Sequence, residues 1–277
     1  MRARICTFVA ETRPLNCLMA AFAALIGILV SRVPFAAAES VRVAILAFVV
    51  VFLVTAGGNV INDYFDFAID RVNRPDRAIP SGRITRQAAL LYALALSLLG
   101  VAISLFINPA CFVLAALNAT LLILYSWRLK QSALIGNLLV GYLTGSVFLF
   151  GGAAVSAIFI PGVLFVSAML AITSREIVKD VEDLVGDKAG GATTLPIRCG
   201  VALSLVVAAL FMLAAVVISP LPFVLGALGP AYLGIVIIAD VILLCSSALA
   251  WSAPARASEF IKYGMLVVLV AYLAGVL

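Results

Sequence analysis

The sequence contains no histidine. Imidazole is therefore excluded as a general base, a metal ligand or a haem ligand. The five cysteines are scattered, mostly through apolar segments, and have neither the spacing of metal ligands nor that of a disulfide framework. We interpret them as small packing residues. Any metal ion must then be held by oxygen atoms, and this favours Mg²⁺, Ca²⁺ or Mn²⁺.

Charge is also scarce. Only 11% of the residues are charged, whereas soluble domains contain about a quarter. The chain is 65% hydrophobic, its mean hydropathy is +1.24, and its apolar runs match the roughly 20 residues that cross a bilayer as a helix. No cleavable signal peptide is evident, because the first apolar run is as long as a span. We therefore expect an all-α, polytopic membrane protein.

The apolar runs predict nine transmembrane helices around a central cavity, in a single domain over residues 1–277. The predicted ranges are 15–32, 42–63, 87–107, 110–126, 133–152, 157–179, 199–218, 226–250 and 259–277. Placing the N-terminus in the cytoplasm puts all but two of the 18 Lys and Arg residues there, the exceptions being Arg32 and Arg42. This positive-inside bias predicts a cytoplasmic N-terminus and, with nine spans, an external C-terminus.

Acidic residues number only 13, and most of them lie in two windows, 63–76 and 176–187, at the cytoplasmic ends of two predicted helices. The windows share the spacing i, i+4, i+7, i+11, which places four residues on one face of a helix. The matched positions are Asn59, Asp63, Asp66 and Asp70 in the first window and Glu176, Asp180, Asp183 and Asp187 in the second. A basic stretch with glycine or proline follows each. The pattern predicts two related halves, a common way of building membrane cavities.

Carboxylates on one helical face repel one another unless a cation lies among them. Two such faces across a cavity would supply oxygen ligands for Mg²⁺, which also binds phosphate oxygens. The neighbouring arginines and lysines would hold the rest of an anionic group, so the combination suits a diphosphate bridged by metal ions. The simpler alternative is that the acids cap helix ends and pair with loop arginines.

Other polar positions carry weaker signals. Arg13 and Asn16 open the first predicted helix and are either an interfacial anchor or part of the site. Tyr125 and Lys130 close the fourth helix on the same side as both acidic windows, where aromatic and basic residues are also ordinary interfacial features. Asp240 lies inside the eighth predicted span, and intramembrane acids are candidates for function.

The motif Asn62-Asp63-x-x-Asp66-x-x-x-Asp70 resembles the NDxxDxxxD signature of the UbiA superfamily of intramembrane prenyltransferases. Asp183-x-x-x-Asp187 resembles the second DxxxD signature of this family, and the nine-helix pattern extends the resemblance over essentially the whole chain. The resemblance implies that a Mg²⁺-bound isoprenoid diphosphate ionises and that its prenyl chain passes to an acceptor in the membrane.

The resemblance also implies site residues. The expected metal ligands are Asn62, Asp66, Asp183 and Asp187, with Asp63, Asp70 and Asp180 as further ligands or supporting carboxylates. The expected diphosphate-binding residues are Arg13, Asn16, Arg71, Arg74, Arg77, Arg128, Lys130, Lys179 and Lys188. The expected catalytic residues are Asp66, Asp183, Tyr125 and Lys130. Many family members have a YxxxK motif after the fourth helix, but here the bases follow Tyr125 at +3 and +5.

The strings ETRPLNCLMA and TSREIVKDVEDLVGDKAGGATTLP resemble family members that make archaeal ether lipids. They imply transfer of a geranylgeranyl group from geranylgeranyl diphosphate to geranylgeranylglyceryl phosphate. One alternative is an aromatic acceptor of quinone, haem or chlorophyll synthesis, and another is a cation-coupled transporter. We expect a plasma-membrane protein whose active site faces the cytoplasm, with membrane lipids as partners and with neither a nucleic acid nor a protein partner.

Overall fold

The computed structural model describes residues 2–32, 38–130 and 132–276, and this part of the chain is helical apart from one isolated bridge between Ser132 and Thr193. It contains 8 helices that are long and apolar enough to cross a membrane. They are α3 (Ala38–Phe65), α5 (Arg86–Ser104), α6 (Pro109–Leu124), α7 (Ile135–Ala154), α8 (Phe159–Glu182), α11 (Val201–Ile218), α13 (Pro230–Leu249) and α14 (Pro254–Val276). The multi-pass, all-α prediction is thus confirmed.

The first predicted span corresponds to α2 (Pro14–Val30), an apolar helix of 17 residues. Each of the eight spans has at least 19 residues, because the span that contains α6 continues to Leu129. The remaining elements are shorter still. They are α1 (Arg2–Glu11), α4 (Phe67–Asn73), the π-helix η1 (Tyr125–Leu129), α9 (Leu184–Ala189), α10 (Leu195–Cys199) and α12 (Leu221–Val224). Nine spans and the sidedness of the two termini therefore stay predictions.

Prolines explain where several predicted helix boundaries were wrong. The last predicted helix begins at 259, but α14 begins five residues earlier at Pro254, and the eighth begins at Pro230 instead of 226. Proline suits the first helical position, because its fixed φ is already helical and no hydrogen bond is expected of its nitrogen there. Leu277, the last residue of the predicted ninth helix, lies outside the described residues.

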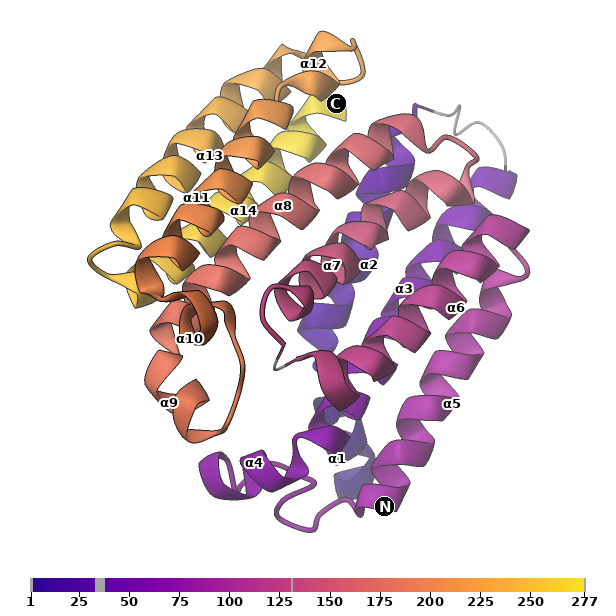
Figure 1. The fold of residues 1–277 in the computed structure, drawn as a ribbon. Coiled ribbons are helices and arrows are strands. Elements are labelled where there is room, and N and C mark those ends of the chain that lie inside the picture. The colour runs from indigo at the N-terminus through magenta and orange to yellow at the C-terminus, as the bar shows by residue number, and fades with distance from the viewer. Residues whose placement is uncertain (1, 33–37, 131, 277) are drawn as a thin grey trace.

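The helices are arranged as a bundle in which sequence neighbours pack side by side, as α7 does with α8 and α13 with α14 (Figure 1). One hydrophobic cluster joins α2, α3, α6 and α7, and a second joins α8, α11, α13 and α14. A third cluster contains side chains from both groups, including Phe148 of α7, Leu164 of α8 and Tyr272 of α14. The outer helix faces expose large apolar side chains such as Leu98 and Leu210, as expected for surfaces that meet lipid.

Helices α2 and α7 approach each other so closely that glycine is required at the crossing. A Cβ atom on Gly151 would lie 2.0 Å from the backbone oxygen of Ala24, and one on Gly27 would lie 2.3 Å from that of Phe148. Small residues at helix contacts are typical of membrane bundles, since they let backbones pack directly. This contact holds α2 against α7. It therefore also positions Arg13 and Pro14, where α2 starts.

Candidate active site

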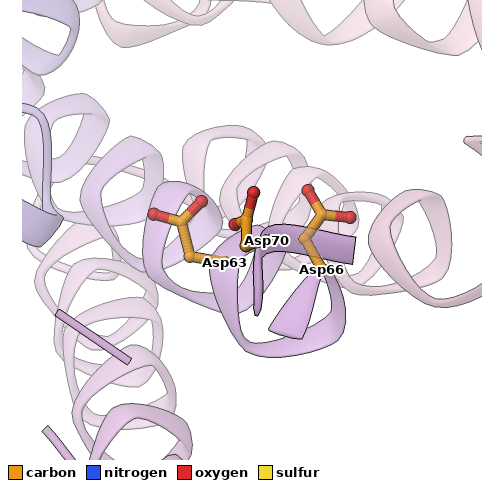
Figure 2. Close-up of side chains that lie close together, drawn as sticks. All are labelled: Asp63, Asp66 and Asp70. Atoms are coloured by element: carbon orange, nitrogen blue, oxygen red, sulfur yellow. The ribbon is translucent and has the colours of Figure 1, made fainter. Parts of the chain in front are cut away.

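Three carboxylates of the first acidic motif form a compact cluster. Each of Asp63, Asp66 and Asp70 offers one oxygen, and the three oxygens lie within 4.8 Å of one another (Figure 2). Asp63 and Asp70 are buried, with exposed fractions of 4% and 6%. Oxygen donors at this spacing suit a hard cation such as Mg²⁺, so the residues fit the metal that the family resemblance implies.

The expectation that the motif occupies one continuous helix is wrong. Helix α3 ends at Phe65 and α4 begins at Phe67, so Asp66 stands at a break between them. The backbone still bonds in the helical pattern around this point, because the Asp66 amide donates to the Asn62 carbonyl and the Asp70 amide donates to the Asp66 carbonyl. The short helix therefore changes direction without losing its hydrogen bonds, and it carries Asp70 to the other two carboxylates.

Basic side chains already balance the charge of the cluster. The guanidinium of Arg13 lies 2.5 Å from Asp63, and that of Arg77 lies 3.0 Å from Asp63 and 2.6 Å from Asp70. The ammonium of Lys130 lies 2.5 Å from Asp66. Burial lowers the pKa of Arg77, but the charges of Asp63 and Asp70 outweigh this effect and raise it overall. The side-chain amide of Asn62 also donates to Asp66 over 2.9 Å.

Arg13 reaches the cluster from an unusual backbone conformation. Arg13 is the N-cap of α2 and directly precedes Pro14. Its φ of 51° is in the left-handed region, which costs free energy for a residue with a Cβ atom. Proline disfavours a helical conformation in the residue before it, so the turn between α1 and α2 falls here. The preceding segment is anchored by Asn59, whose side-chain amide donates to the Thr12 carbonyl over 2.8 Å. Strain at a position that contacts the carboxylates is consistent with a functional role.

Glu11 belongs to the same region and was not predicted. Its carboxylate accepts a hydrogen bond from the backbone amide of Ala78 over 3.2 Å. Burial raises the pKa of Glu11, and the nearby charge of Asp63 raises it further. A single glutamate on a short amphipathic stretch carries no motif, so only its position two residues before Arg13 could have indicated it.

The second acidic motif repeats the helix break but not the cluster. Helix α8 ends at Glu182 and α9 begins at Leu184, with Asp183 between them. Asp180 accepts a hydrogen bond from the Asn137 amide over 2.8 Å, whereas Asp183 is exposed. Burial raises the pKa of Asp187, and the charge of Asp183 adds to this shift. Among the described residues, the only group of three or more acids close enough to share a metal ion is the first motif.

A cavity of about 690 Å³ runs between the helices, and most of its wall is apolar. Its polar end is formed by predicted site residues from several helices. These residues are Arg13, Asn16, Asn62, Tyr125, Lys130 and Lys179. The wall also contains Lys262 of α14, which was not predicted as part of the site, and Asn118 of α6. The Asn118 amide donates to the Ser146 hydroxyl of α7 over 2.9 Å, and its side-chain oxygen is buried without a hydrogen-bond partner among the described residues.

The π-helix η1 explains the unusual spacing of Tyr125 and Lys130. The Lys130 backbone amide donates to the Tyr125 carbonyl over 3.0 Å, which is the i→i+5 bond of a π-helix. The wider turn lets a base five residues after the tyrosine line the same cavity. Arg128, at +3, is exposed and stacks on the Trp127 ring at 4.3 Å. Of the two bases after Tyr125, Lys130 is therefore the one that reaches the site.

Several predicted diphosphate-binding residues lie away from this arrangement. Arg71 and Arg74 are exposed on and after α4, and Lys188 is exposed on α9. None of the three lines the cavity in the described structure. Their prediction came from sequence distance to the acidic motifs, whereas in the structure all three side chains are exposed.

A second group of polar side chains lines the cavity away from the acidic cluster. The Ser219 hydroxyl donates to Asp240 over 2.6 Å, and the Tyr232 hydroxyl donates to the Ser219 carbonyl over 2.5 Å. Ser219 follows the last residue of α11, and Tyr272 stacks on Tyr232 with ring centroids 5.6 Å apart. Ser219, Asp240 and Tyr272 line the cavity. The intramembrane acid is thus hydrogen-bonded within a buried group that is separate from both acidic motifs.

The fold and the site define a helical membrane protein with an acidic cluster whose basic and amide partners Arg13, Lys130 and Asn62 line an apolar cavity. Residues 18–270 match the UbiA prenyltransferase family, and the chain belongs to this family. It is a prenyltransferase, and this family membership argues against the transporter hypothesis.

Two relatives are similar to this chain over almost their whole length. The digeranylgeranylglyceryl phosphate synthase of Methanopyrus kandleri is 48% identical over 270 residues, covering 96% of this chain and 97% of the relative. That of Methanosarcina mazei is 45% identical, and the match covers 100% of both chains. A solved structure concerning digeranylgeranylglyceryl phosphate synthase has a TM-score of 0.87 at 39% identity and covers 99% of each chain. A UbiA homologue from Archaeoglobus fulgidus bound to GPP and Mg²⁺ has a TM-score of 0.70 at 18% identity, with 95% of this chain and 99% of that chain covered, and shares the fold.

Proposed function

We propose that this prenyltransferase transfers a geranylgeranyl group from geranylgeranyl diphosphate to geranylgeranylglyceryl phosphate, in a reaction that requires Mg²⁺. The observation that carries the proposal is the cluster of Asp63, Asp66 and Asp70, whose partners Arg13, Asn62 and Lys130 line the polar end of an apolar cavity. The names of the full-length relatives support the choice of acceptor.

The proposed metal ligands are the oxygen-bearing side chains of both motifs. They are Asn62, Asp63, Asp66, Asp70, Asp180, Asp183 and Asp187. Mg²⁺ bound there would supply positive charge against which a diphosphate can leave from an allylic carbon. The first cluster is already assembled around buried carboxylates, so its geometry would need little rearrangement.

The side chains around the cluster have distinct proposed roles. Arg13, Arg77 and Lys130 hold the diphosphate oxygens by charge-assisted hydrogen bonds, exchanging part of their contact with the aspartates. Tyr125 lines the cavity, and its proposed place is beside the reacting carbon of the bound donor. The apolar wall excludes water, which would otherwise quench the developing allylic cation. The allylic carbon–oxygen bond of the donor breaks, the acceptor hydroxyl oxygen forms the new bond, and its proton is released.

We also propose that the polar end of the cavity faces the cytoplasm in the plasma membrane. The basis is the distribution of Lys and Arg along the sequence, which concentrates on the side of both acidic motifs. Both substrates carry phosphate groups and apolar tails, so a polar end at the membrane surface and an apolar interior suit their shape.

The test uses purified full-length protein in detergent, with geranylgeranyl diphosphate as donor and either geranylgeranylglyceryl phosphate or 4-hydroxybenzoate as acceptor. Diphosphate release and prenylated product are followed with Mg²⁺ and with EDTA. We expect Mg²⁺-dependent product with the glyceryl phosphate alone. Product only with 4-hydroxybenzoate would keep the site but overturn the acceptor, and product that persists in EDTA would overturn the metal requirement.

A further inference from the structure

Among the described residues, two of the four basic side chains that line the cavity form no ion pair. Arg13 and Lys130 form ion pairs with the first acidic cluster. Lys179 and Lys262 also line the cavity, but within the described residues neither forms an ion pair or a side-chain hydrogen bond. Lys179 acts on Asp187 only through its charge, which lowers the pKa of that carboxyl group against the opposing effect of burial.

The two lysines lie at the same end of the cavity. Lys179 is near the end of α8 and Lys262 is in the first half of α14, and these two helices pack against each other (Figure 1). Val178 and Ile261, the residues that precede the two lysines, belong to one buried cluster. The polar wall thus has two sides. Arg13 and Lys130 are engaged with aspartates on one side, and two unpaired ammonium groups come from α8 and α14 on the other.

Lys179 and Lys262 are exposed and line the cavity, so an anion that enters the cavity can reach both ammonium groups. Each ammonium group offers three donors and a full positive charge. In the proposed function, the basic residues that hold the donor diphosphate are Arg13, Arg77 and Lys130, and neither of these two lysines is among them. Lysine binds phosphate as a point charge, without the planar geometry that arginine imposes. A phosphate monoester is a compact dianion, and two lysines from neighbouring helices match its charge.

We infer that Lys179 and Lys262 form a subsite for the phosphate monoester of the lipid acceptor. The inference rests on the proposed function, and it assigns Lys179 to the acceptor in place of the donor diphosphate that the sequence pattern indicated. With the phosphate held by α8 and α14, the acceptor glycerol lies across the cavity from the acidic cluster. The prenyl tails of both substrates then extend in parallel along the apolar wall.

Equilibrium binding tests the subsite without requiring turnover. The probes are geranylgeranylglyceryl phosphate and its dephosphorylated alcohol, each titrated against the full-length protein in detergent in the absence of donor. For the wild type, we expect the phosphate ester to bind at least about 10-fold more tightly than the alcohol. The double variant Lys179→Gln/Lys262→Gln should reduce this ratio to about 1, and each single variant should reduce it partly, with the affinity for geranylgeranyl diphosphate little changed.

Arg256→Gln is the matched control, because Arg256 is an exposed base on the same helix that does not line the cavity. It should leave the ratio at its wild-type value. Equal binding of the ester and the alcohol by the wild type, or an unchanged ratio in the double variant, would overturn the subsite. If the double variant lost affinity for the donor instead of the acceptor, the subsite would be overturned and both lysines would be assigned to the donor diphosphate. Tight, lysine-dependent binding without product would confirm the subsite and overturn the proposed transfer.

Discussion

Asp66 and Asp183 stand at equivalent breaks in the two halves of the chain, each between the end of a long helix and the start of a short one. The first break joins α3 to α4 and the second joins α8 to α9. At both, the aspartate carbonyl accepts a bond from the backbone amide four residues later, over 2.8 Å at Asp66 and 2.9 Å at Asp183. The side chains differ, because Asp66 is paired with Lys130 whereas Asp183 is exposed. The break is therefore a property of the backbone that does not depend on the ion pair.

If both aspartates hold the metal ion, Asp66→Asn and Asp183→Asn should each lower turnover by about 100-fold or more, since an amide supplies a neutral ligand in place of a charged one. The melting temperature without metal should change little, because neither substitution alters side-chain volume. Initial rates at saturating donor provide the measurement, and Glu259→Gln, an exposed acid outside both motifs, is the control. Wild-type turnover in Asp183→Asn would restrict the metal site to the first cluster.

Arg77 connects two buried carboxylates, and its removal should show whether a metal ion can replace it. Arg77→Gln leaves Asp63 and Asp70 without their shared cation, and the loss of charge-assisted hydrogen bonds should cost about 2 kcal/mol of stability in EDTA. In Mg²⁺ the loss should be smaller, because the ion supplies the missing charge. Melting temperatures of wild type and variant in EDTA and in Mg²⁺ give the comparison. An equal loss in both buffers would show that no metal ion reaches these two carboxylates.

Much of the site could be predicted from local spacing. Asp63, Asp66 and Asp70 were identified because their i, i+3 and i+7 positions share one helical face, and the break at Asp66 still left them together. The break itself could not be predicted, since no proline or glycine stands at it and the hydrogen-bond pattern continues through it. The same holds for Asp183 in the second motif.

Residues brought to the site by tertiary packing were harder to identify. Lys262 was counted only as part of the positive-inside bias, because a lone lysine at a helix start is an ordinary interfacial residue. Its place on the cavity wall depends on how α14 packs against α8. Conversely, Arg71, Arg74 and Lys188 were predicted from their distance in sequence to the acidic motifs. The structure leaves these three side chains exposed, because the direction of a short helix is not determined by its own residues.

Gly151 should be intolerant of any side chain. In Gly151→Ala the new Cβ atom meets the Ala24 carbonyl oxygen, so α2 and α7 must separate, at a cost of roughly 1–3 kcal/mol of stability. Gly234→Ala is the matched control, because a Cβ atom there has nothing within 4 Å and alanine is the better helix former. Thermal unfolding in detergent should show a lower melting temperature for the first variant and an equal or higher one for the second. Equal melting temperatures for both variants would mean that α2 and α7 are not in direct backbone contact.

Asp240 tests whether an intramembrane acid of this protein takes part in the chemistry. Its carboxylate accepts the Ser219 hydroxyl, and the same hydroxyl lies 3.0 Å from the Val216 carbonyl, so Ser219 has another acceptor if the carboxylate is removed. Asp240→Asn keeps an acceptor of the same shape and should retain turnover within about 2-fold, whereas Asp240→Ala should lose the hydrogen bond and about 1 kcal/mol of stability. Turnover and melting temperature of both variants decide between a structural and a chemical role. A large loss of turnover in Asp240→Asn at an unchanged melting temperature would mean that the reaction requires the charge of Asp240, and would place a part of the reaction far from both acidic motifs.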